Sequence, residues 1–277
     1  MMRWVGRMPY VKRTTKAGKT IEIEYYYTSQ YNRKGRTKRD KVKATEEAQK
    51  RINTKQAERK IRLLMNNNFG YGDFHLVLDY IRHKGEQDRT PEQMKKDIQI
   101  FLRECRKEYR KHSLEFKYIH VMEIGKRGAR HHHLVVNHID PQILQKAWYK
   151  AYEGHNRVKI FPLDDSGQYS KLASYFIKYT SEHLRDENGK RLQGKRWNAS
   201  KNLVMPEPDY EIITDRAWYR CEARAPKGYY VEKDSIEKGI VSPEYYGWGY
   251  YRYRLIELDN IQERTKKKRK RGNKCVT

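Results

Sequence analysis

The chain has few cysteines and no long apolar run. Only three of its 277 residues are cysteines, Cys105, Cys221 and Cys275, and they are widely separated and odd in number. This fits neither a disulfide framework nor a zinc ribbon and indicates a reducing compartment. No stretch approaches the roughly 20 apolar residues of a transmembrane helix, and the first residues lack the apolar core of a signal peptide. We therefore expect a cytoplasmic protein with no membrane partner.

Acidic residues are scarce relative to basic ones. Lys and Arg total 61 against 35 Asp and Glu, which gives a formal net charge of +26. A charge this large repels itself unless a polyanion is the working partner, so nucleic acid is the leading inference. The 23 tyrosines favour it further, because aromatic rings among cations can stack on unpaired bases. A merely soluble basic protein, a ribosomal protein or a membrane-surface protein would share this composition.

The sequence is organised around a histidine run that leads into an apolar stretch, residues 131–136 (HHHLVV). Upstream, residues 118–124 (YIHVMEI) also have the composition of a strand. Residues 125–128 (GKRG) between them are a turn signal. The two stretches together predict a β-hairpin.

Side chains alternate between the two faces of a strand, so His131 and His133 point one way and His132 points the other. The hairpin brings Glu123 back towards His131 and His133. Two imidazoles and a carboxylate suit a divalent metal that keeps open coordination positions. A surface strand with incidental histidines would give the same pattern.

The metal expected at this site is Mn²⁺ or Mg²⁺. The mixed set of imidazole and carboxylate ligands favours Mn²⁺ in vitro, because imidazole is a poor ligand for Mg²⁺. His120 and His138 are the substitutes if one of the three main candidates is not a ligand.

Residues 170–180 (SKLASYFIKYT) predict a helix that carries Tyr175, Lys178 and Tyr179. Tyr175 and Lys178 are three residues apart, and Tyr175 and Tyr179 are four apart, so the three can occupy neighbouring surface of one helix. Aromatic residues at helical spacing are more often core than catalytic, and this spacing alone indicates little.

Together, the His-x-His pair with its apolar run and the later Tyr-x-x-Lys-Tyr resemble the HUH endonucleases, the rolling-circle replication initiators of plasmids and phages. Residues 73–80 look like the first conserved strand of that family, with Asp79 where relatives commonly carry Thr. Residues 196–203 are similar to a segment after the tyrosine helix in replication-associated proteins of mobile elements and filamentous phages. The likeness covers roughly residues 45–208, and the departure at Asp79 concerns local DNA contacts.

The resemblance implies a metal-dependent single-strand DNA endonuclease and strand transferase that nicks an origin and initiates rolling-circle replication. We assign the nucleophile to Tyr175, which would form a covalent phosphotyrosine; Lys178 would add positive charge nearby, and Tyr179 is the competing tyrosine. No helicase motor is present, so host helicase and polymerase are the expected partners besides origin DNA. A transposase or relaxase on the same fold, and a non-catalytic nucleic-acid-binding protein, are the alternatives.

Helix and strand signals alternate in the order β-α-β-β-α-β-α. This order favours an α+β fold in which helices pack on one face of an antiparallel sheet, and it agrees with the RRM or ferredoxin-like fold that the resemblance implies. Thr45 predicts the start of an earlier helix that runs to about Met65. Thr90 forms a capping box with the residue three positions on, and Asp140 precedes another helix.

We expect three segments along the chain: a basic N-terminal segment with a short strand (1–44), an HUH endonuclease domain (45–208) and a Tyr-rich accessory region with a basic tail (209–277). Residues 245–251 could stack on bases or pack back on the core. The candidate DNA-binding residues are all basic: Arg33, Lys34, Arg36, Lys38, Arg39, Arg196 and Lys201.

Overall fold

The computed structural model describes residues 10–28, 45–81, 88–125, 129–153, 156–182, 197–213, 222–241 and 248–258. Contacts group the chain into two compact units, one of residues 1–41 with 206–277 and the other of residues 42–205. The three-segment division expected from the sequence stays a prediction. Within the described ranges, no helix is both long and apolar enough to cross a membrane.

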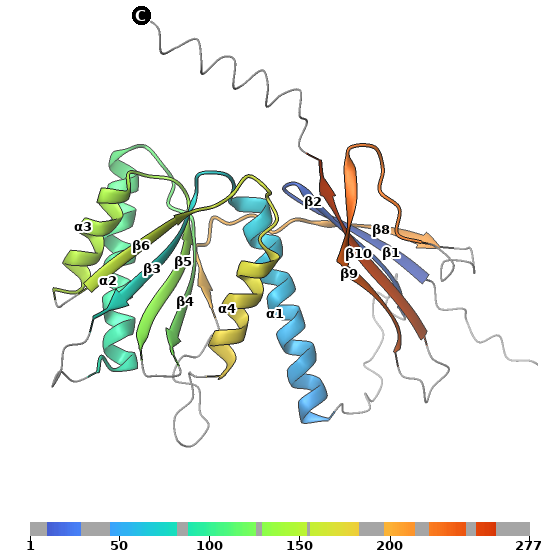
Figure 1. Cartoon of the computed structure of the whole chain (residues 1–277), viewed down its shortest axis with the longest axis horizontal. Coiled ribbons are helices and arrows are strands. Elements are labelled where there is room, and N and C mark those ends of the chain that lie inside the picture. Colours follow the sequence, from blue (N-terminus) through green and yellow to red (C-terminus); the bar gives the residue numbers. More distant parts are fainter. Residues whose placement is uncertain are drawn as a thin grey trace, which may run out of the picture. The chain divides into compact units, whose positions relative to one another are not determined.

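The unit of residues 42–205 is built on a five-stranded antiparallel sheet with the strand order β6-β3-β5-β4-β7 (Figure 1). Strands that are distant in the sequence are therefore neighbours, and β3 pairs with β5 and β6. The strands are β3 (Phe74–Tyr80), β4 (Tyr118–Ile124), β5 (Arg130–Val136), β6 (Asn156–Pro162) and β7 (Asn198–Ala199). The α+β class and the predicted order of elements are confirmed.

Four helices accompany this sheet: α1 (Glu46–Asn68), α2 (Pro91–Lys111), α3 (Pro141–Ala151) and α4 (Ser170–Glu182). The predicted caps are present, since the side chains of Thr45, Thr90 and Asp140 each accept a backbone hydrogen bond from the first turn of α1, α2 and α3. The expectation that α1 ends near Met65 was wrong. The asparagines that follow stay helical, and Asn68 bonds back to the carbonyl of Leu64.

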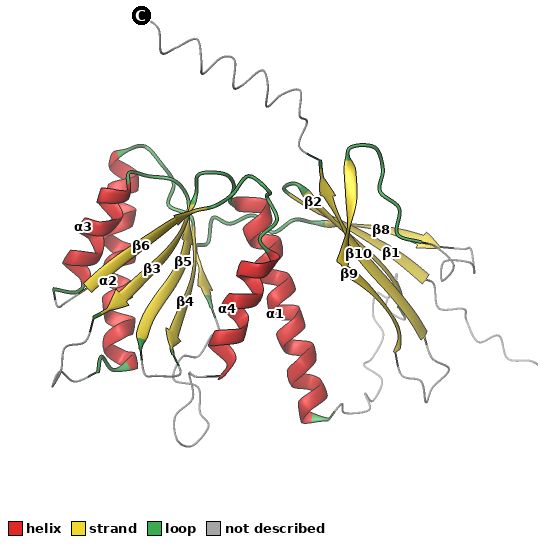
Figure 2. Cartoon of the chain, viewed as in Figure 1, coloured by secondary structure: helices red, strands yellow, loops and turns green. Residues whose placement is uncertain are grey.

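The expectation that helices cover one face of the sheet was also wrong, because they cover both (Figure 2). One apolar cluster joins α2 and α3 to β3 and β5 and includes Phe101, Trp148 and Leu134. The other joins α1 and α4 to β4 and β5 and includes Phe176 and Val135. Neighbouring residues of β5 thus enter different cores, so this strand is apolar on both sides.

The unit of residues 1–41 and 206–277 holds a second five-stranded antiparallel sheet, in the order β8-β1-β2-β10-β9. The N-terminal and C-terminal strands therefore form one sheet. Tyr251 and Tyr253 are buried beside Ile23, so packing is the role of these two tyrosines. The strands are β1 (Tyr10–Ala17), β2 (Thr20–Tyr27), β8 (Pro208–Ile213), β9 (Tyr229–Val241) and β10 (Trp248–Glu257).

Several residues singled out in the sequence lie outside the described ranges. They include two cysteines, the basic C-terminal tail and most of the candidate DNA-binding residues: Cys221, Cys275, Arg33, Lys34, Arg36, Lys38, Arg39 and Arg196. Lys201 is described, is exposed, and lies in the turn after β7.

Candidate metal centre

The β4–β5 hairpin brings the predicted metal ligands together. Its register sets Glu123 directly across from His131. The Oε2 atom of Glu123 lies 3.2 Å from Nε2 of His131 and 2.9 Å from Nε2 of His133. The ligand atoms of the three residues lie within 4.8 Å of one another, and Glu123 and His133 are buried. This group could hold a metal ion.

The protonation states of these side chains fit a metal site, because a metal needs deprotonated ligands. Burial raises the pKa of Glu123, but hydrogen bonds from His131 and His133 outweigh it and bring that pKa to about 2. Burial lowers the pKa of His133 below its ordinary value. Glu123 is therefore ionised and His133 neutral at pH 7. One oxygen and two nitrogen donors leave positions open for substrate.

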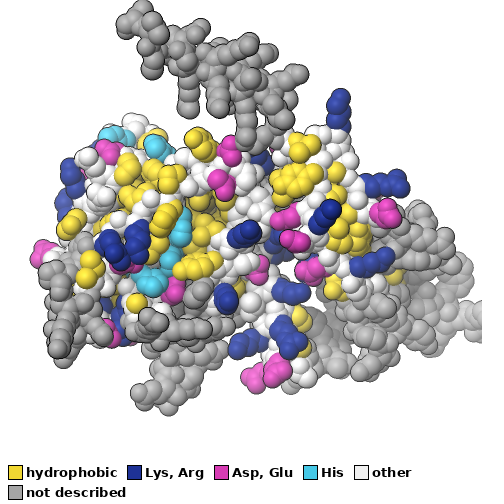
Figure 3. Space-filling view, viewed as in Figure 1, with side chains coloured by type: hydrophobic (Ala, Val, Ile, Leu, Met, Phe, Trp, Pro, Cys, Tyr) yellow, Lys and Arg dark blue, Asp and Glu magenta, His cyan; other side chains and the backbone are white. Residues whose placement is uncertain are grey.

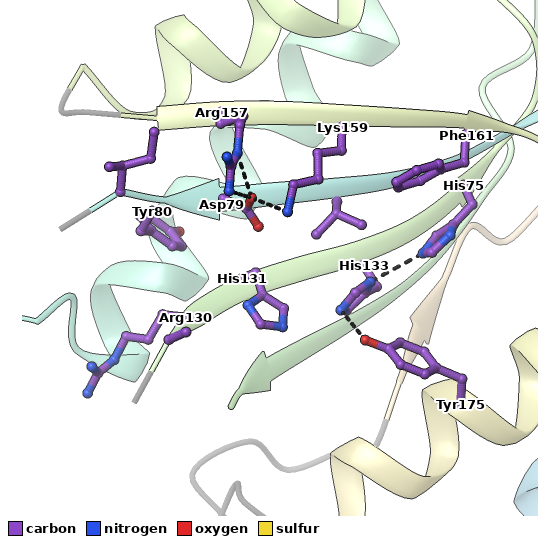
Figure 4. A pocket seen from close by; sticks show the side chains of 13 residues that line it. His75, Asp79, Tyr80, Arg130, His131, His133, Arg157, Lys159, Phe161 and Tyr175 are labelled. Carbon is purple, nitrogen blue, oxygen red and sulfur yellow. Dashed lines mark hydrogen bonds and ion pairs between the residues drawn. The ribbon is translucent and has the colours of Figure 1, made fainter. Parts of the chain in front are cut away.

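Helix α4 brings the hydroxyl of Tyr175 to the same place. It lies 3.3 Å from Oε2 of Glu123 and 3.2 Å from Nε2 of His133 (Figure 4). The buried side chains of Ala173, Phe176 and Ile177 hold this helix in the core between α4, α1 and the sheet. A nucleophilic oxygen is thus within hydrogen-bonding distance of two of the three metal-ligand candidates.

The other two residues predicted on this helix contribute less to the described site. The side chain of Lys178 is exposed one turn beyond Tyr175, and it is not among the described residues that line the groove around the histidines. Tyr179 belongs to α4, but its side chain lies outside the described part of the structure.

A third histidine, not singled out in the sequence, supports the metal centre. His75 on β3 places its Nε2 3.2 Å from Nδ1 of His133, and the two rings stack with centroids 5.5 Å apart. For Nε2 of His133 to offer its lone pair to a metal, its Nδ1 must carry the proton and donate it to His75. Burial lowers the pKa of His75 to about 3, so this ring is neutral and can accept that hydrogen bond.

The metal-ligand candidates open onto a groove of about 560 Å³ along the face of the sheet. Arg157, Lys159 and Phe161 of β6 form its far wall (Figure 4). Asp79 lies between the two cations, with its Oδ2 3.0 Å from a guanidinium nitrogen of Arg157 and 2.9 Å from Nζ of Lys159. Figure 3 shows Lys and Arg side chains next to the histidines on this face of the molecule.

The opposite face of the sheet carries a buried polar network. His132 points into it, as the strand alternation predicted, and its Nδ1 lies 3.0 Å from Nε2 of His120. Its Nε2 lies 2.9 Å from the hydroxyl of Tyr80, which donates to Asp97. Arg89 completes the network with two bonds to Asp97. His120 is therefore not available to the metal group as a substitute ligand.

Two further predicted features have structural roles in the described residues. His138 lies away from the metal centre, where its ring bonds to the carbonyl of Gly72 and its backbone N–H donates to Asp73. The segment after the tyrosine helix pairs with the edge strand β4, and Ser200 exchanges two hydrogen bonds with the backbone of Tyr118. That segment extends the sheet on the side away from β6.

Residues 74–184 match the model of a family of replication-associated proteins, described by its member ORF2. The match begins at β3 and includes the metal group and the helix that carries Tyr175. The matched segment is similar to replication-associated proteins. Comparison with curated proteins and with solved structures gave no match. The family match and the geometry thus concern the same part of the chain.

Proposed function

We propose that this protein is a metal-dependent single-strand DNA endonuclease and strand transferase that initiates rolling-circle replication. One observation carries the proposal: the hydroxyl of Tyr175 lies 3.2 Å from Nε2 of His133 and 3.3 Å from Oε2 of Glu123. A tyrosine packed only for structure has no reason to end at a metal-ligand group. The family match to replication-associated proteins supports the same function.

Glu123, His131 and His133 would hold the metal, with Mn²⁺ favoured over Mg²⁺ because two of the three ligands are imidazoles. When bound, a divalent metal would polarise the scissile phosphate and offset the charge that develops in the transition state. The histidines also orient one another, since Nδ1–H of His133 donates to His75 and leaves Nε2 facing the site.

The chemical step uses Tyr175 as the nucleophile. Its phenolic oxygen forms a bond to phosphorus, the bond from phosphorus to the 3′ oxygen breaks, and the electron pair of that bond stays on the 3′ oxygen. The phenolic proton is released to water and the 3′ oxygen takes one up, so no co-reactant is needed. The covalent phosphotyrosine keeps the bond energy for later rejoining. Lys178, one turn further along α4, adds positive charge on the side of the phosphate.

The polarity of cleavage rests on the resemblance to HUH initiators, in which the tyrosine takes the 5′-phosphate. A free 3′-hydroxyl would then prime a host polymerase, and a host helicase would unwind the template. The same active site would serve a transposase or a conjugative relaxase, and the substrate separates these: an initiator cuts the replication origin of the element that encodes it.

The test is adduct formation on single-stranded DNA from the element that encodes the protein. With Mn²⁺, a labelled strand should become covalently attached to the protein and be cut at one position. EDTA, or His131→Ala, should abolish both products while leaving DNA binding in place, because the phosphate contacts do not need the metal. His138→Ala is the matched control and should nick normally. DNA binding with no adduct under any metal would favour a non-catalytic binding protein instead.

A further inference from the structure

The edge strand β6 presents an unusual row of side chains towards the metal centre. Arg157, Lys159 and Phe161 alternate along the strand and line the groove (Figure 4). The residues between them, Val158 and Ile160, pack against the opposite core. Because side chains two apart on a strand share a face, this row is a continuous wall of two cations and one aromatic ring.

Phe161 is half exposed, with 50% of its surface open to solvent, although its strand neighbours are packed. Its ring centroid lies 5.8 Å from that of His75, so the ring stands next to the metal-ligand group. An exposed aromatic ring at the wall of a basic groove is the arrangement that binds unpaired bases by stacking. A base inside a duplex is already stacked on its neighbours and does not offer its face.

The two cations are held over the groove. The side chain of Asp79 is only 13% exposed, while those of Arg157 and Lys159 are 58% and 41% exposed. Arg157 directs two of its nitrogens, at 3.0 and 3.1 Å, to the same carboxylate oxygen that Lys159 contacts. One carboxylate cannot neutralise two cations, so the wall keeps a net positive charge, and its cations keep donors for further acceptors.

We propose that β6 is the binding track for the unpaired strand, with Phe161 stacked on a base and Arg157 and Lys159 on the phosphates that flank it. Asp79 fixes the two cations in position beforehand. The proposal rests on the proposed function, since it names the part of the substrate that this site grips. Stacking and phosphate contact tolerate any sequence, so this track supplies affinity and position rather than recognition of the origin.

The experiment measures binding of a fluorescent single-stranded oligonucleotide to the full chain by anisotropy, in EDTA so that nothing is cut. Phe161→Ala should weaken binding about 10-fold, because a stacking interaction of intermediate strength is lost. Phe161→Trp should bind at least as tightly as wild type. Tyr149→Ala, which removes an aromatic ring 61% exposed on α3, is the matched control and should not change binding.

The charge of the wall is tested by the salt dependence of binding. Lys159→Ala should reduce the slope of log K against log salt concentration by about 0.7, the value for one phosphate contact on a single strand. Lys146→Ala removes an exposed lysine on α3 and should leave the slope unchanged. Equal slopes for the two variants would overturn the proposal.

A crosslinking readout locates the base directly. An oligonucleotide carrying 5-iodouracil should crosslink to Phe161 under ultraviolet light, as mapped by mass spectrometry of the peptide. Crosslinks found only elsewhere, together with wild-type binding by Phe161→Ala, would overturn the track. If Phe161→Ala weakens binding but no variant ever forms an adduct, the track stands and the proposed nuclease fails. If adducts form and Phe161→Ala binds normally, the nuclease stands and the track fails.

Discussion

The Nε2 atom of His75 lies 3.2 Å from Nδ1 of His133. The two histidines come from strands that pair in the middle of the sheet, β3 and β5. Because the other nitrogen of His133 faces Glu123, this contact decides which nitrogen of His133 is free for a metal. His75 is thus a positioning residue that never needs to touch the metal.

We expect His75→Phe to weaken Mn²⁺ binding by roughly 10- to 100-fold, the usual cost of losing a partner that orients a ligand. His75→Gln should lose less, since its amide oxygen can accept the same hydrogen bond from Nδ1 of His133. Titration calorimetry with Mn²⁺ measures both. His138→Gln is the control, because His138 lies away from the metal centre and is exposed. Equal affinities for His75→Phe and wild type would rule out the positioning role.

The sequence predicted the local part of this geometry well. Alternation along two strands joined by a short turn was enough to set Glu123 across from His131. The contribution of His75 could not be predicted in the same way, because it depends on β3 pairing with a strand more than 50 residues away. The row on β6 has a visible signal, Arg157, Lys159 and Phe161 in alternate positions, but only the sheet order places that row beside the metal group.

The second sheet illustrates the same limit. β1 and β2 form a local hairpin, and β2 was predicted from its alternating apolar residues. β10 pairs with β2 across more than 200 residues, and no local pattern could predict that pairing. Its tyrosines and arginines alternate, but both residue types are long and amphipathic, so the contrast between a buried and an exposed face is weak.

A pH dependence of stability follows from the buried histidine pair on the far face. Burial lowers the pKa of His120 to about 3, against an ordinary value of 6.5 in the unfolded chain. Below pH 6.5 the unfolded state therefore takes up a proton that the folded state refuses. The free energy of unfolding should fall by about 1.4 kcal/mol per pH unit for that proton as the pH drops from 6.5 towards 3.

Urea unfolding between pH 7 and pH 5 measures this loss, and His120→Leu should show a smaller loss over the same interval. The absolute stability of that variant will also be lower at pH 7, because His132 loses the partner of its Nδ1. The change in slope, not the offset, is the test. His112→Leu is the control, since His112 follows α2 as an exposed residue. An unchanged slope for His120→Leu would contradict the prediction.

DNA binding should weaken steeply with salt and survive removal of the metal. The basis is the net charge of +26, much of it in residues 32–43 and 266–274, which lie outside the described part of the chain. If six phosphate contacts form, affinity for a single strand should fall on the order of 10²- to 10³-fold between 50 and 200 mM salt. Deleting residues 266–277 should weaken binding while leaving the cleavage position unchanged. A salt-independent affinity would show that these charges do not meet the DNA backbone.

The last prediction separates the two tyrosines of α4. Tyr175→Phe removes only the hydroxyl that lies 3.2 Å from Nε2 of His133, and the ring still packs edge-on against that histidine. The covalent adduct should therefore disappear while Mn²⁺ binding and DNA binding persist. Tyr179→Phe should leave the first nick intact, and would impair only a second strand transfer if both tyrosines act.

Denaturing gels with a labelled strand report the adduct, and mass spectrometry of the linked peptide locates it. Tyr149→Phe on α3 controls for the loss of an exposed tyrosine elsewhere. Calorimetry with Mn²⁺ and anisotropy in EDTA establish that Tyr175→Phe still binds metal and DNA, so that a missing adduct reports chemistry and not misfolding. An adduct found on Tyr179 alone would move the nucleophile one turn along the helix. It would also leave the contact between the hydroxyl of Tyr175 and Glu123 as a hydrogen bond that only supports a metal ligand.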